Sequence, residues 1–198
     1  VIGVIIANEV LDALPVERIV FKDKKLYRQG IGLSTDNCSN SLEFKLLPLT
    51  QTLDESLQYI MEGASIKIPP DNSPDSWTTE WHIDFNQWFK SYSKCIKSGP
   101  LLIIDYALEA KRYYHPSRLD GTLISYHNQK ATSDILLDPG FLDITSHICL
   151  ETLNCFAEQN QWYFAGQVRQ GQALLALGLA EKFNQLKDFP SNKLQEAL

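Results

Sequence analysis

Two groups of polar residues stand directly after apolar runs, where the strands of an α/β sheet would end. Asn8, Glu9 and Asp12 follow the apolar residues 1–7, and Asp105 and Tyr106 follow the apolar residues 101–104. Ligands of open α/β sheets bind beyond the carboxyl ends of the strands, so we expect these side chains to border an acidic binding site. The alternative is structural: Asn8 and Asp12 would then cap and begin a turn, and Asp105 would cap its loop.

The motifs of several other chemistries are absent from the sequence. There is no G-x-S-x-G, no Walker loop and no H-E-x-x-H, and the four histidines are widely spaced. The one G-x-G, residues 30–32, lacks the third glycine and lies in a predicted hairpin region, which favours a turn or bulge over a cofactor loop. The four cysteines form no CxxC pair, so we predict neither a metal site nor a redox motif.

The composition indicates which classes of binding partner the protein can have. The 198 residues carry 18 Lys and Arg against 24 Asp and Glu, a net charge of −6, and 44% of them are hydrophobic. This describes one globular domain, or one domain with a lobe, that has a substantial core. The acidic balance disfavours nucleic acid, which is bound through Lys and Arg. No apolar run could cross a bilayer and no secretory signal is present, so we expect a cytoplasmic protein without membrane insertion, or a mitochondrial matrix protein if the source is eukaryotic.

The hydrophobic pattern predicts an α/β sheet with an antiparallel lobe. Residues 1–6 and 101–104 are typical of parallel strands buried on both faces, and residues 16–50 alternate like antiparallel hairpins. The polar stretch 108–140 is long enough to be a functional loop or lid. Because the chain starts inside an apolar run, we expect it to be the C-terminal part of something longer. The remaining predicted elements are helices at 52–61, 83–96, 145–159 and 170–183 and a strand at 162–168.

Several blocks resemble those of the MidA family, proteins similar to the mitochondrial complex I assembly methyltransferase. Residues 7–16, reading ANEVLDALPV, and residues 143–147, reading DITSH, are the most specific. Further blocks occur in the family's order: Trp77 to Glu80 with Trp88, Gly99 to Tyr106 reading GPLLIIDY, Arg118 with Gly121, Thr122, Leu123 and Tyr126, and Gln170 with Leu174 to Leu179.

The resemblance implies the fold and the cofactor. The family consists of class I S-adenosylmethionine-dependent methyltransferases, with a Rossmann-like sheet and an extra substrate lobe. Residues 1–15 and 76–185 would be the C-terminal half of that methyltransferase domain, residues 16–75 an inserted β-rich substrate lobe, and residues 186–198 a tail. The family's glycine-rich cofactor loop belongs to its N-terminal half and is absent from these 198 residues.

The resemblance also implies protein arginine methylation. Carboxylates that hold a guanidinium on one side leave electron density on the nitrogen that attacks the methyl group. We therefore predict Glu9 and Asp12 as catalytic residues and Asn8 as a cofactor contact, with no metal. We expect the substrate side to be lined by Tyr106, Arg118, Thr122, Tyr126 and His147. Each of the last four could instead hold the long loop: Arg118 through a salt bridge, Thr122 and Tyr126 through hydrogen bonds, and His147 by starting a helix.

Two functions from different classes follow. The first is an S-adenosylmethionine-dependent protein arginine methyltransferase acting on a subunit of a complex I type NADH dehydrogenase. The second is a non-catalytic module, or assembly factor for the same complex, that keeps the substrate lobe and contacts a partner.

Overall fold

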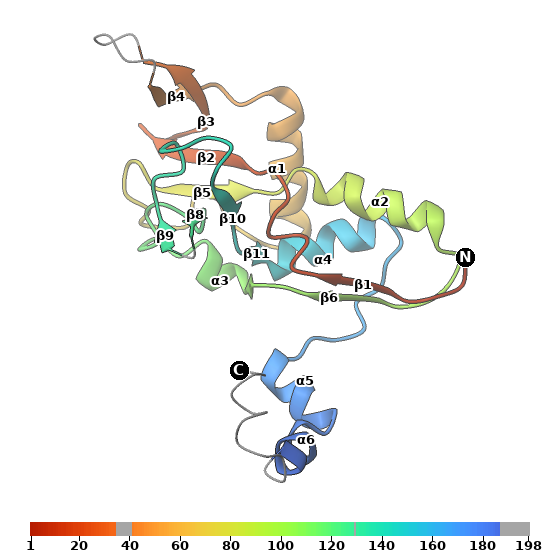
Figure 1. Ribbon diagram of the computed structural model, residues 1–198. Coiled ribbons are helices and arrows are strands. Elements are labelled where there is room, and N and C mark those ends of the chain that lie inside the picture. The colour runs from red at the N-terminus through yellow and green to blue at the C-terminus, as the bar shows by residue number, and fades with distance from the viewer. Residues whose placement is uncertain (35–40, 129, 187–198) are drawn as a thin grey trace. The chain divides into compact units, whose positions relative to one another are not determined.

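The computed structural model describes residues 1–34, 41–128 and 130–186 (Figure 1). The chain divides into two compact units, Val1–Phe164 and Ala165–Leu198. The first unit is mixed α/β and contains every residue predicted to belong to the site.

Two short parallel strands carry the polar residues of interest. Strand β1 (Ile5–Asn8) pairs with β6 (Leu101–Ile104) so that Asn8 lies opposite Ile104, and Figure 1 shows the two strands side by side. Both strands therefore end at the same edge. This confirms the prediction that the residues after the two apolar runs meet there.

A close contact between two glycines precedes this pair of strands. The backbone of Gly99 has φ +142°, and a Cβ built there would lie 1.7 Å from the carbonyl oxygen of Gly3. Only glycine fits such an approach. The amide of Gly3 also donates to the carbonyl of Ser98 at 3.1 Å, so the two segments are already aligned before the strands begin.

The expectation that both faces of these strands are buried is wrong. Ala7 is only 4% exposed, whereas Ile6 is 65% exposed and Leu102 is 49% exposed. Successive side chains of a strand point to opposite faces. One face packs on the core, and among the described residues nothing covers the other.

The antiparallel lobe predicted over residues 16–50 is confirmed. Strands β2 (Glu17–Lys22), β3 (Lys25–Leu33) and β4 (Leu42–Leu47) form an antiparallel sheet in the order β4-β3-β2-β5, where β5 is Thr78–Trp81. Asp23 and Lys24 turn the chain between β2 and β3 with positive φ. Because β5 belongs to this sheet, the sheet extends past the predicted lobe 16–75; the division into domains stays a prediction.

Three helices pack against the sheets and close the core. They are α1 (Gln51–Gly63), α2 (Phe85–Cys95) and α4 (Leu150–Gln159), and Figure 1 shows α2 and α4 close together. Each helix buries an apolar stripe, as amphipathic helices do. The buried residues are Leu53, Leu57 and Ile60 on α1, Phe85 and Phe89 on α2, and Leu153 and Phe156 on α4, together with Trp77 and Trp81.

The stretch 108–140 is more structured than its polar composition predicted. Strand β7 (Ala107–Leu108) is followed by the short helix α3 (Ala110–Tyr113). Strands β8 (Ile124–His127), β9 (Lys130–Thr132) and β10 (Asp143–Thr145) then form an antiparallel sheet in the order β10-β8-β9. The prediction of one long irregular loop is therefore wrong, because its polar residues lie on short strands with exposed faces.

Three further predictions in the C-terminal third need correction. The helix predicted from residue 145 begins at Leu150, because β11 (Ile148–Cys149) pairs with β7 in parallel. Residues 162–168 form no strand. The helix predicted at 170–183 is two helices, α5 (Gln170–Ala176) and α6 (Leu179–Leu186), separated at Gly178, whose φ of +91° does not continue a helix.

Residues 187–198, most of the predicted tail, lie outside the described residues. Among the helices of the described part of the chain, none is both long and apolar enough to span a membrane.

Candidate active site

Glu9 lies exposed at the point where the two parallel strands end. Its amide donates to the carbonyl of Ile104 at 2.8 Å, and its φ of +48° turns the chain sharply away from β1. The hydroxyl of Tyr106 donates to Glu9 Oε1 at 3.3 Å. The two predicted side chains, separated by 97 positions in sequence, are therefore in contact. Asn8, the predicted cofactor contact, is exposed beside them as the last residue of β1.

Asp105 holds the turn that follows β1. Its Oδ2 accepts from the amides of Leu11 and Asp12 at 3.0 and 3.3 Å, and its Oδ1 accepts from the amide of Tyr106 at 2.8 Å. Burial raises the pKa of Asp105, and the nearby charge of Asp12 raises it further, against the lowering effect of these hydrogen bonds. Asp105 therefore caps a turn, as the structural alternative predicted, but this turn follows β1 and not β6, the strand that precedes Asp105.

Asp12 is buried, with 8% of its surface exposed. Its Oδ2 accepts from the hydroxyl of Thr145 at 2.8 Å, and its carbonyl accepts from the amide of Ser146 at 3.0 Å. Its Oδ1 is also buried and has no hydrogen-bond partner among the described residues. Asp12 therefore ties the β1 turn to the DITSH segment and keeps one acceptor unused. We call Glu9, Asp12 and Asp105 the acidic rim.

His147 lies beside the acidic rim. Its ring centroid is 6.3 Å from that of Tyr106, and the carbonyl of Tyr106 accepts from the amide of Ile148 at 2.9 Å. The negative charge of Glu9 is the main cause of a raised pKa at the exposed Tyr106 hydroxyl. Burial, followed by the charge of Arg118, lowers the pKa of the half-buried His147. His147 does not start a helix, because α4 begins at Leu150.

Thr122 is buried in a hydrogen-bond network centred on Glu80. Both its amide and its hydroxyl donate to Glu80 Oε2, at 2.7 and 3.0 Å. The Thr122 hydroxyl oxygen also accepts from the amide of His147 at 3.1 Å. Thr122 thus holds His147 in place through hydrogen bonds, which is the structural alternative stated above, and its buried side chain does not line an open surface.

Glu80 itself is fully buried and was not among the predicted site residues. Arg18 Nε lies 3.7 Å from Glu80 Oε1, and the terminal nitrogen Nη2 of Arg18 donates to the carbonyl of Asp120 at 3.0 Å. Burial raises the pKa of Glu80, opposed by the hydrogen bonds from Thr122 and the charge of Arg18. No signal in the sequence marked Glu80, because only the structure shows that Thr78–Trp81 is a fully buried strand, where a carboxylate needs specific partners.

The two other predicted substrate residues flank this network. Tyr126 is 41% exposed on β8, and its charge is the smallest of the causes that raise the pKa of Tyr106, after the charge of Glu9. Arg118 forms no salt bridge with any described residue; its Nε donates to the carbonyl of Arg112 at 3.3 Å. The structure therefore places Glu9, Asp12, Tyr106, His147 and Tyr126 around one edge, with Thr122 behind them.

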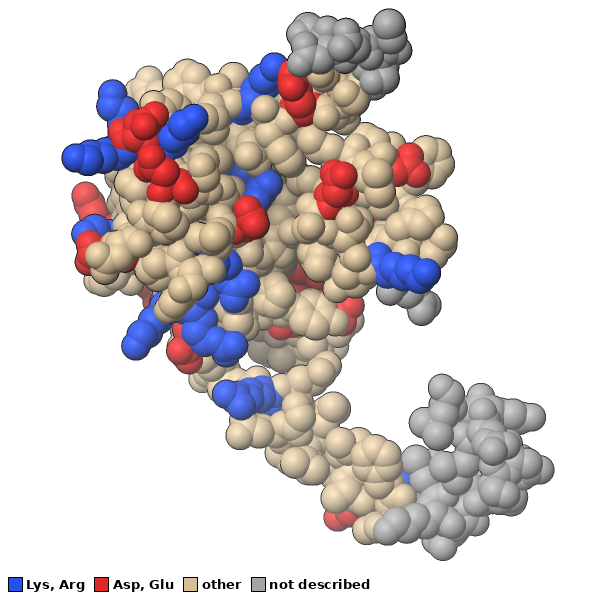
Figure 2. Space-filling model, turned by 90° about the vertical axis from the view of Figure 1, so that its left-hand side faces the viewer, with Lys and Arg blue, Asp and Glu red and all other residues tan. Residues whose placement is uncertain are grey.

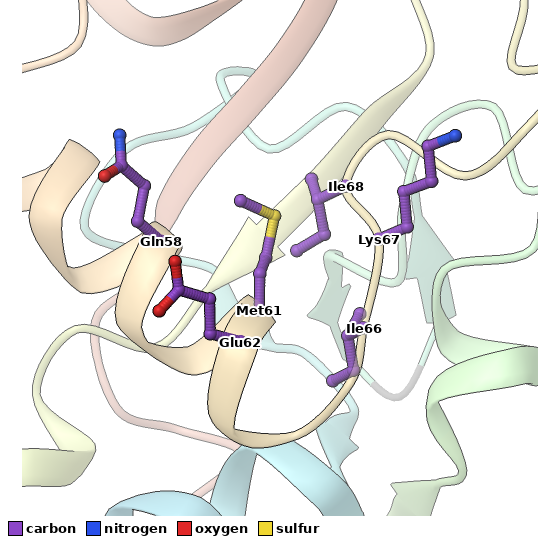
Figure 3. Close-up of a pocket in the computed structure, with 6 residues that line it drawn as sticks. All are labelled: Gln58, Met61, Glu62, Ile66, Lys67 and Ile68. Atoms are coloured by element: carbon purple, nitrogen blue, oxygen red, sulfur yellow. The ribbon is translucent and has the colours of Figure 1, made fainter.

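A separate pocket lies away from this edge. It has a volume of ≈ 360 Å³ and is formed by the C-terminal part of α1 and the segment after it. Figure 3 shows Met61 pointing toward Ile68, with Gln58 and Lys67 directed outward. None of the predicted site residues lines it. The residues that line it are Gln58, Met61, Glu62, Ile66, Lys67 and Ile68.

The acidic rim has the chemistry of a cation site. The exposed carboxylate of Glu9 and the exposed Tyr106 ring can stabilise a sulfonium or a guanidinium. The residues present therefore fit the sulfonium end of S-adenosylmethionine. Within the described residues, no group of His, Cys, Asp and Glu side chains is arranged to hold a metal ion.

Two parallel strands that end at one edge are typical of α/β proteins, whose ligands bind beyond the carboxyl ends of the strands. Residues 1–168 match a family described as "putative S-adenosyl-L-methionine-dependent methyltransferase". The chain belongs to this methyltransferase family, whose cofactor is S-adenosylmethionine, and the resemblance to MidA proteins is confirmed.

Solved structures share the fold. A superfamily member from Burkholderia thailandensis bound to S-adenosyl-homocysteine has a TM-score of 0.79 and 22% identity, over 98% of this chain and 46% of that one. An uncharacterized protein of the superfamily from the same organism has a TM-score of 0.80 and 22% identity, over 98% of this chain and 48% of that one. This chain thus spans about half the length of the structures it matches. No curated protein sequence matches it.

Proposed function

We propose that this chain forms the substrate side of an S-adenosylmethionine-dependent protein arginine N-methyltransferase. The observation that supports this most directly is Glu9, an exposed carboxylate at the end of β1 that the Tyr106 hydroxyl contacts at 3.3 Å. S-adenosylmethionine would supply a methyl group already activated on a sulfonium. The chain's own residues then have to position a guanidinium and manage its charge.

Glu9 is placed to hold the guanidinium. An arginine side chain has a pKa above ~12 and attacks poorly while its charge is spread over three nitrogens. A carboxylate that accepts two of its N–H groups draws the positive charge to one side and fixes the direction of the remaining nitrogen. The hydrogen bond from Tyr106 limits the positions that the Glu9 carboxylate can take. Such positioning can lower the activation free energy by several kcal/mol, and by about 7 kcal/mol in favourable cases.

Asp12 and Asp105 would act behind Glu9. The Asp105 carboxylate accepts from the amides of the turn, and the Asp12 carboxylate accepts from the Thr145 hydroxyl. These hydrogen bonds fix the orientation of both carboxylates, which add negative charge to the edge. We propose that this charge attracts the substrate cation and that Asn8, at the end of β1, contacts the cofactor. The direct catalytic role expected for Asp12 stays a prediction, which its burial makes less direct than that of Glu9.

For the substrate, we propose a subunit of a complex I type NADH dehydrogenase. The support is the resemblance to the MidA family, carried by the ANEVLDALPV and DITSH blocks. The check is to incubate the full-length protein that contains this chain with isolated NADH dehydrogenase subunits and labelled S-adenosylmethionine. Label on an arginine of one subunit is expected; equal labelling of unrelated arginine-containing proteins would contradict the assignment.

The second candidate is a non-catalytic module that binds a partner subunit. It is favoured by the exposed apolar face of Ile6 and Leu102, which a partner protein could cover. The two candidates differ in one measurement. Binding of the NADH dehydrogenase subunit without any methyl transfer by the full-length protein would support the module.

The variant Glu9→Gln tests the arginine mechanism. It keeps the shape of the side chain and removes the charge, so we expect methyl transfer to fall by at least about a hundredfold, with S-adenosylmethionine affinity within a few fold by calorimetry. Glu55→Gln, an exposed change on α1, is the matched control and should leave transfer unchanged. Normal turnover by Glu9→Gln would remove Glu9 from the mechanism.

A further inference from the structure

A second pocket lies on the same unit and has the opposite charge from the acidic rim. Its volume is ≈ 430 Å³, and it is lined by Arg112, His115, Ser117 and Arg118. We call these four residues the basic pocket. Figure 2 shows Lys and Arg side chains gathered on one face of the protein, at about the height that α3 has in Figure 1. The pocket stands out because the whole chain carries a net charge of −6.

The backbone beneath the basic pocket is firmly held. The indole Nε1 of Trp77 donates to the carbonyl of His115 at 3.3 Å, and the amide of Arg118 donates to the same carbonyl at 2.9 Å. Tyr113, at the end of α3, is 1% exposed and anchors the helix in the core. The pocket residues are thus presented by a fixed turn, and little ordering is needed when a ligand binds.

The side chains of the basic pocket leave hydrogen-bond donors for a ligand. Arg118 uses only Nε internally, donating to the carbonyl of Arg112 at 3.3 Å, so its terminal nitrogens remain. His115 Nδ1 accepts from the amide of Ser117 at 3.2 Å, which places the ring proton on Nε2 as a donor. No described carboxylate lies within ion-pair distance of either guanidinium.

One short segment links the basic pocket to Asp105, the residue of the acidic rim that follows β6. Strand β7 starts directly after Tyr106, and α3 starts two residues after β7 ends. At the other end of the segment, Arg118 precedes by four residues Thr122, whose hydroxyl holds the amide of His147 at 3.1 Å. The ring centroid of His147 lies 6.3 Å from that of Tyr106. After burial, the charges of Arg118 and Arg112 also lower the pKa of His147, so His147 is close to both the acidic rim and the basic pocket.

We propose that the basic pocket binds the carboxylate of an Asp or Glu that lies a few residues from the target arginine of the substrate peptide. Two guanidinium groups, an imidazole N–H and a hydroxyl match the oxygens of one carboxylate. The substrate would then be bipolar, with its cation on the acidic rim and its anion in the basic pocket. This inference rests on the proposed function and adds a sequence preference to it.

A nucleic acid is the less favoured occupant. Polyanions bind along extended basic surfaces through many phosphate contacts. Here four residues form one compact pocket, and the carboxylates of the acidic rim stand nearby and would repel a chain of phosphates. A single carboxylate avoids that repulsion.

The test measures peptide binding and methyl transfer separately in the full-length protein. Fluorescent peptides carry one arginine and one Glu at each position within four residues of it, and matched peptides carry Gln instead. At the best position, we expect the Glu peptide to bind about tenfold tighter than its Gln partner by anisotropy. Arg112→Gln and Arg118→Gln should each abolish the difference in affinity between the Glu and the Gln peptides. Lys111→Gln, a neighbouring charge outside the pocket, should keep the preference.

The outcomes separate this proposal from the proposed function. A Glu preference lost in both Arg variants, without methyl transfer, would support the basic pocket and contradict the methyltransferase function. Methyl transfer that is indifferent to Glu at every position would overturn the pocket and leave the function standing. Displacement of the Glu peptide by a single-stranded RNA at lower concentration than by free glutamate peptides would overturn the carboxylate in favour of a polyanion.

Discussion

Glu80 holds Thr122 by two hydrogen bonds, and the Thr122 hydroxyl in turn holds the amide of His147. Glu80 is buried without a full set of partners among the described residues: Oε2 accepts two hydrogen bonds from Thr122, while Oε1 accepts none and lies 3.7 Å from Arg18 Nε. A buried charge of this kind is costly unless every neighbour is in place. Small changes around Glu80 should therefore have large effects, although Glu80 is not exposed to a substrate.

The neighbouring Gly121 tests this. Its φ is +70°, and a Cβ there would lie 2.1 Å from Glu80 Oε1. Gly121→Ala should lower the free energy of unfolding by about 3 kcal/mol, from the strained backbone and the clash together. Gly140→Ala is the control, because Gly140 has φ +90° and open space around it; about 1 kcal/mol is expected there. If urea denaturation gave the same loss of unfolding free energy for both variants, the Glu80 side chain would be able to move away at no cost, which would contradict the prediction.

His82 predicts a pH dependence of stability. It is 2% exposed, it contacts Ser146 Oγ through Nε2 at 3.0 Å, and burial lowers its pKa to about 4. Above the ordinary pKa of 6.5 the ring is neutral in both the folded and the unfolded state, so it does not change the stability with pH. As the pH falls from 6.5 to about 4, only the unfolded state takes up the proton, so about 3 kcal/mol of stability is lost.

The measurement is urea unfolding of the wild type and His82→Gln between pH 7 and pH 4. The difference between the two profiles should shrink as the pH falls, because only the wild type carries this proton linkage. Glu80, whose raised pKa has the opposite sign and loses its contribution as the pH rises, is common to both proteins and cancels. His127→Gln, at an exposed position, should follow the wild type; parallel profiles for His82→Gln would contradict the prediction.

At the scale of elements, the β1–β6 pair has one packed face and one exposed face. Ile6 is 65% exposed, whereas Ile19 on β2 is fully buried. Ile19→Thr should cost about 2 kcal/mol, because a hydroxyl replaces a buried ethyl group. Ile6→Thr keeps the β-branch and should change the stability of the 198-residue chain by less than about 0.5 kcal/mol. Thermal denaturation of both variants checks this, and a large loss for Ile6→Thr would mean that this face is covered.

At the scale of the whole molecule, the two compact units are connected by a segment without helix or strand. Residues 162–169 separate α4 from α5, and Arg169 lies directly before α5. Among trypsin sites before residue 170, we expect Arg169 to be cleaved first, leaving a fragment that resists further digestion. Mass spectrometry over a time course measures this. Arg169→Gln should remove the product, and earlier cleavage inside Val1–Phe164 would contradict the two-unit organisation.

How far the sequence predicts this structure depends on how local each signal is. Residues 16–50 alternate clearly and formed the expected hairpins, and the apolar runs before Glu9 and Asp105 placed two strand ends at one edge. Exposure of Ile6 was not predictable, since composition does not say what covers a strand. The role of Glu80 was missed because its partner Thr122 lies 42 positions away.

The glycine pair ahead of the strands has a consequence at the opposite end of the sheet. Because the backbone of Gly99 rests on Gly3, the two strands have one alignment, in which Asn8 faces Ile104. Slippage by a single position would turn every side chain of one strand to the opposite face and separate Glu9 from Tyr106. The contact between the Glu9 carboxylate and the Tyr106 hydroxyl thus depends on two residues that have no side chains.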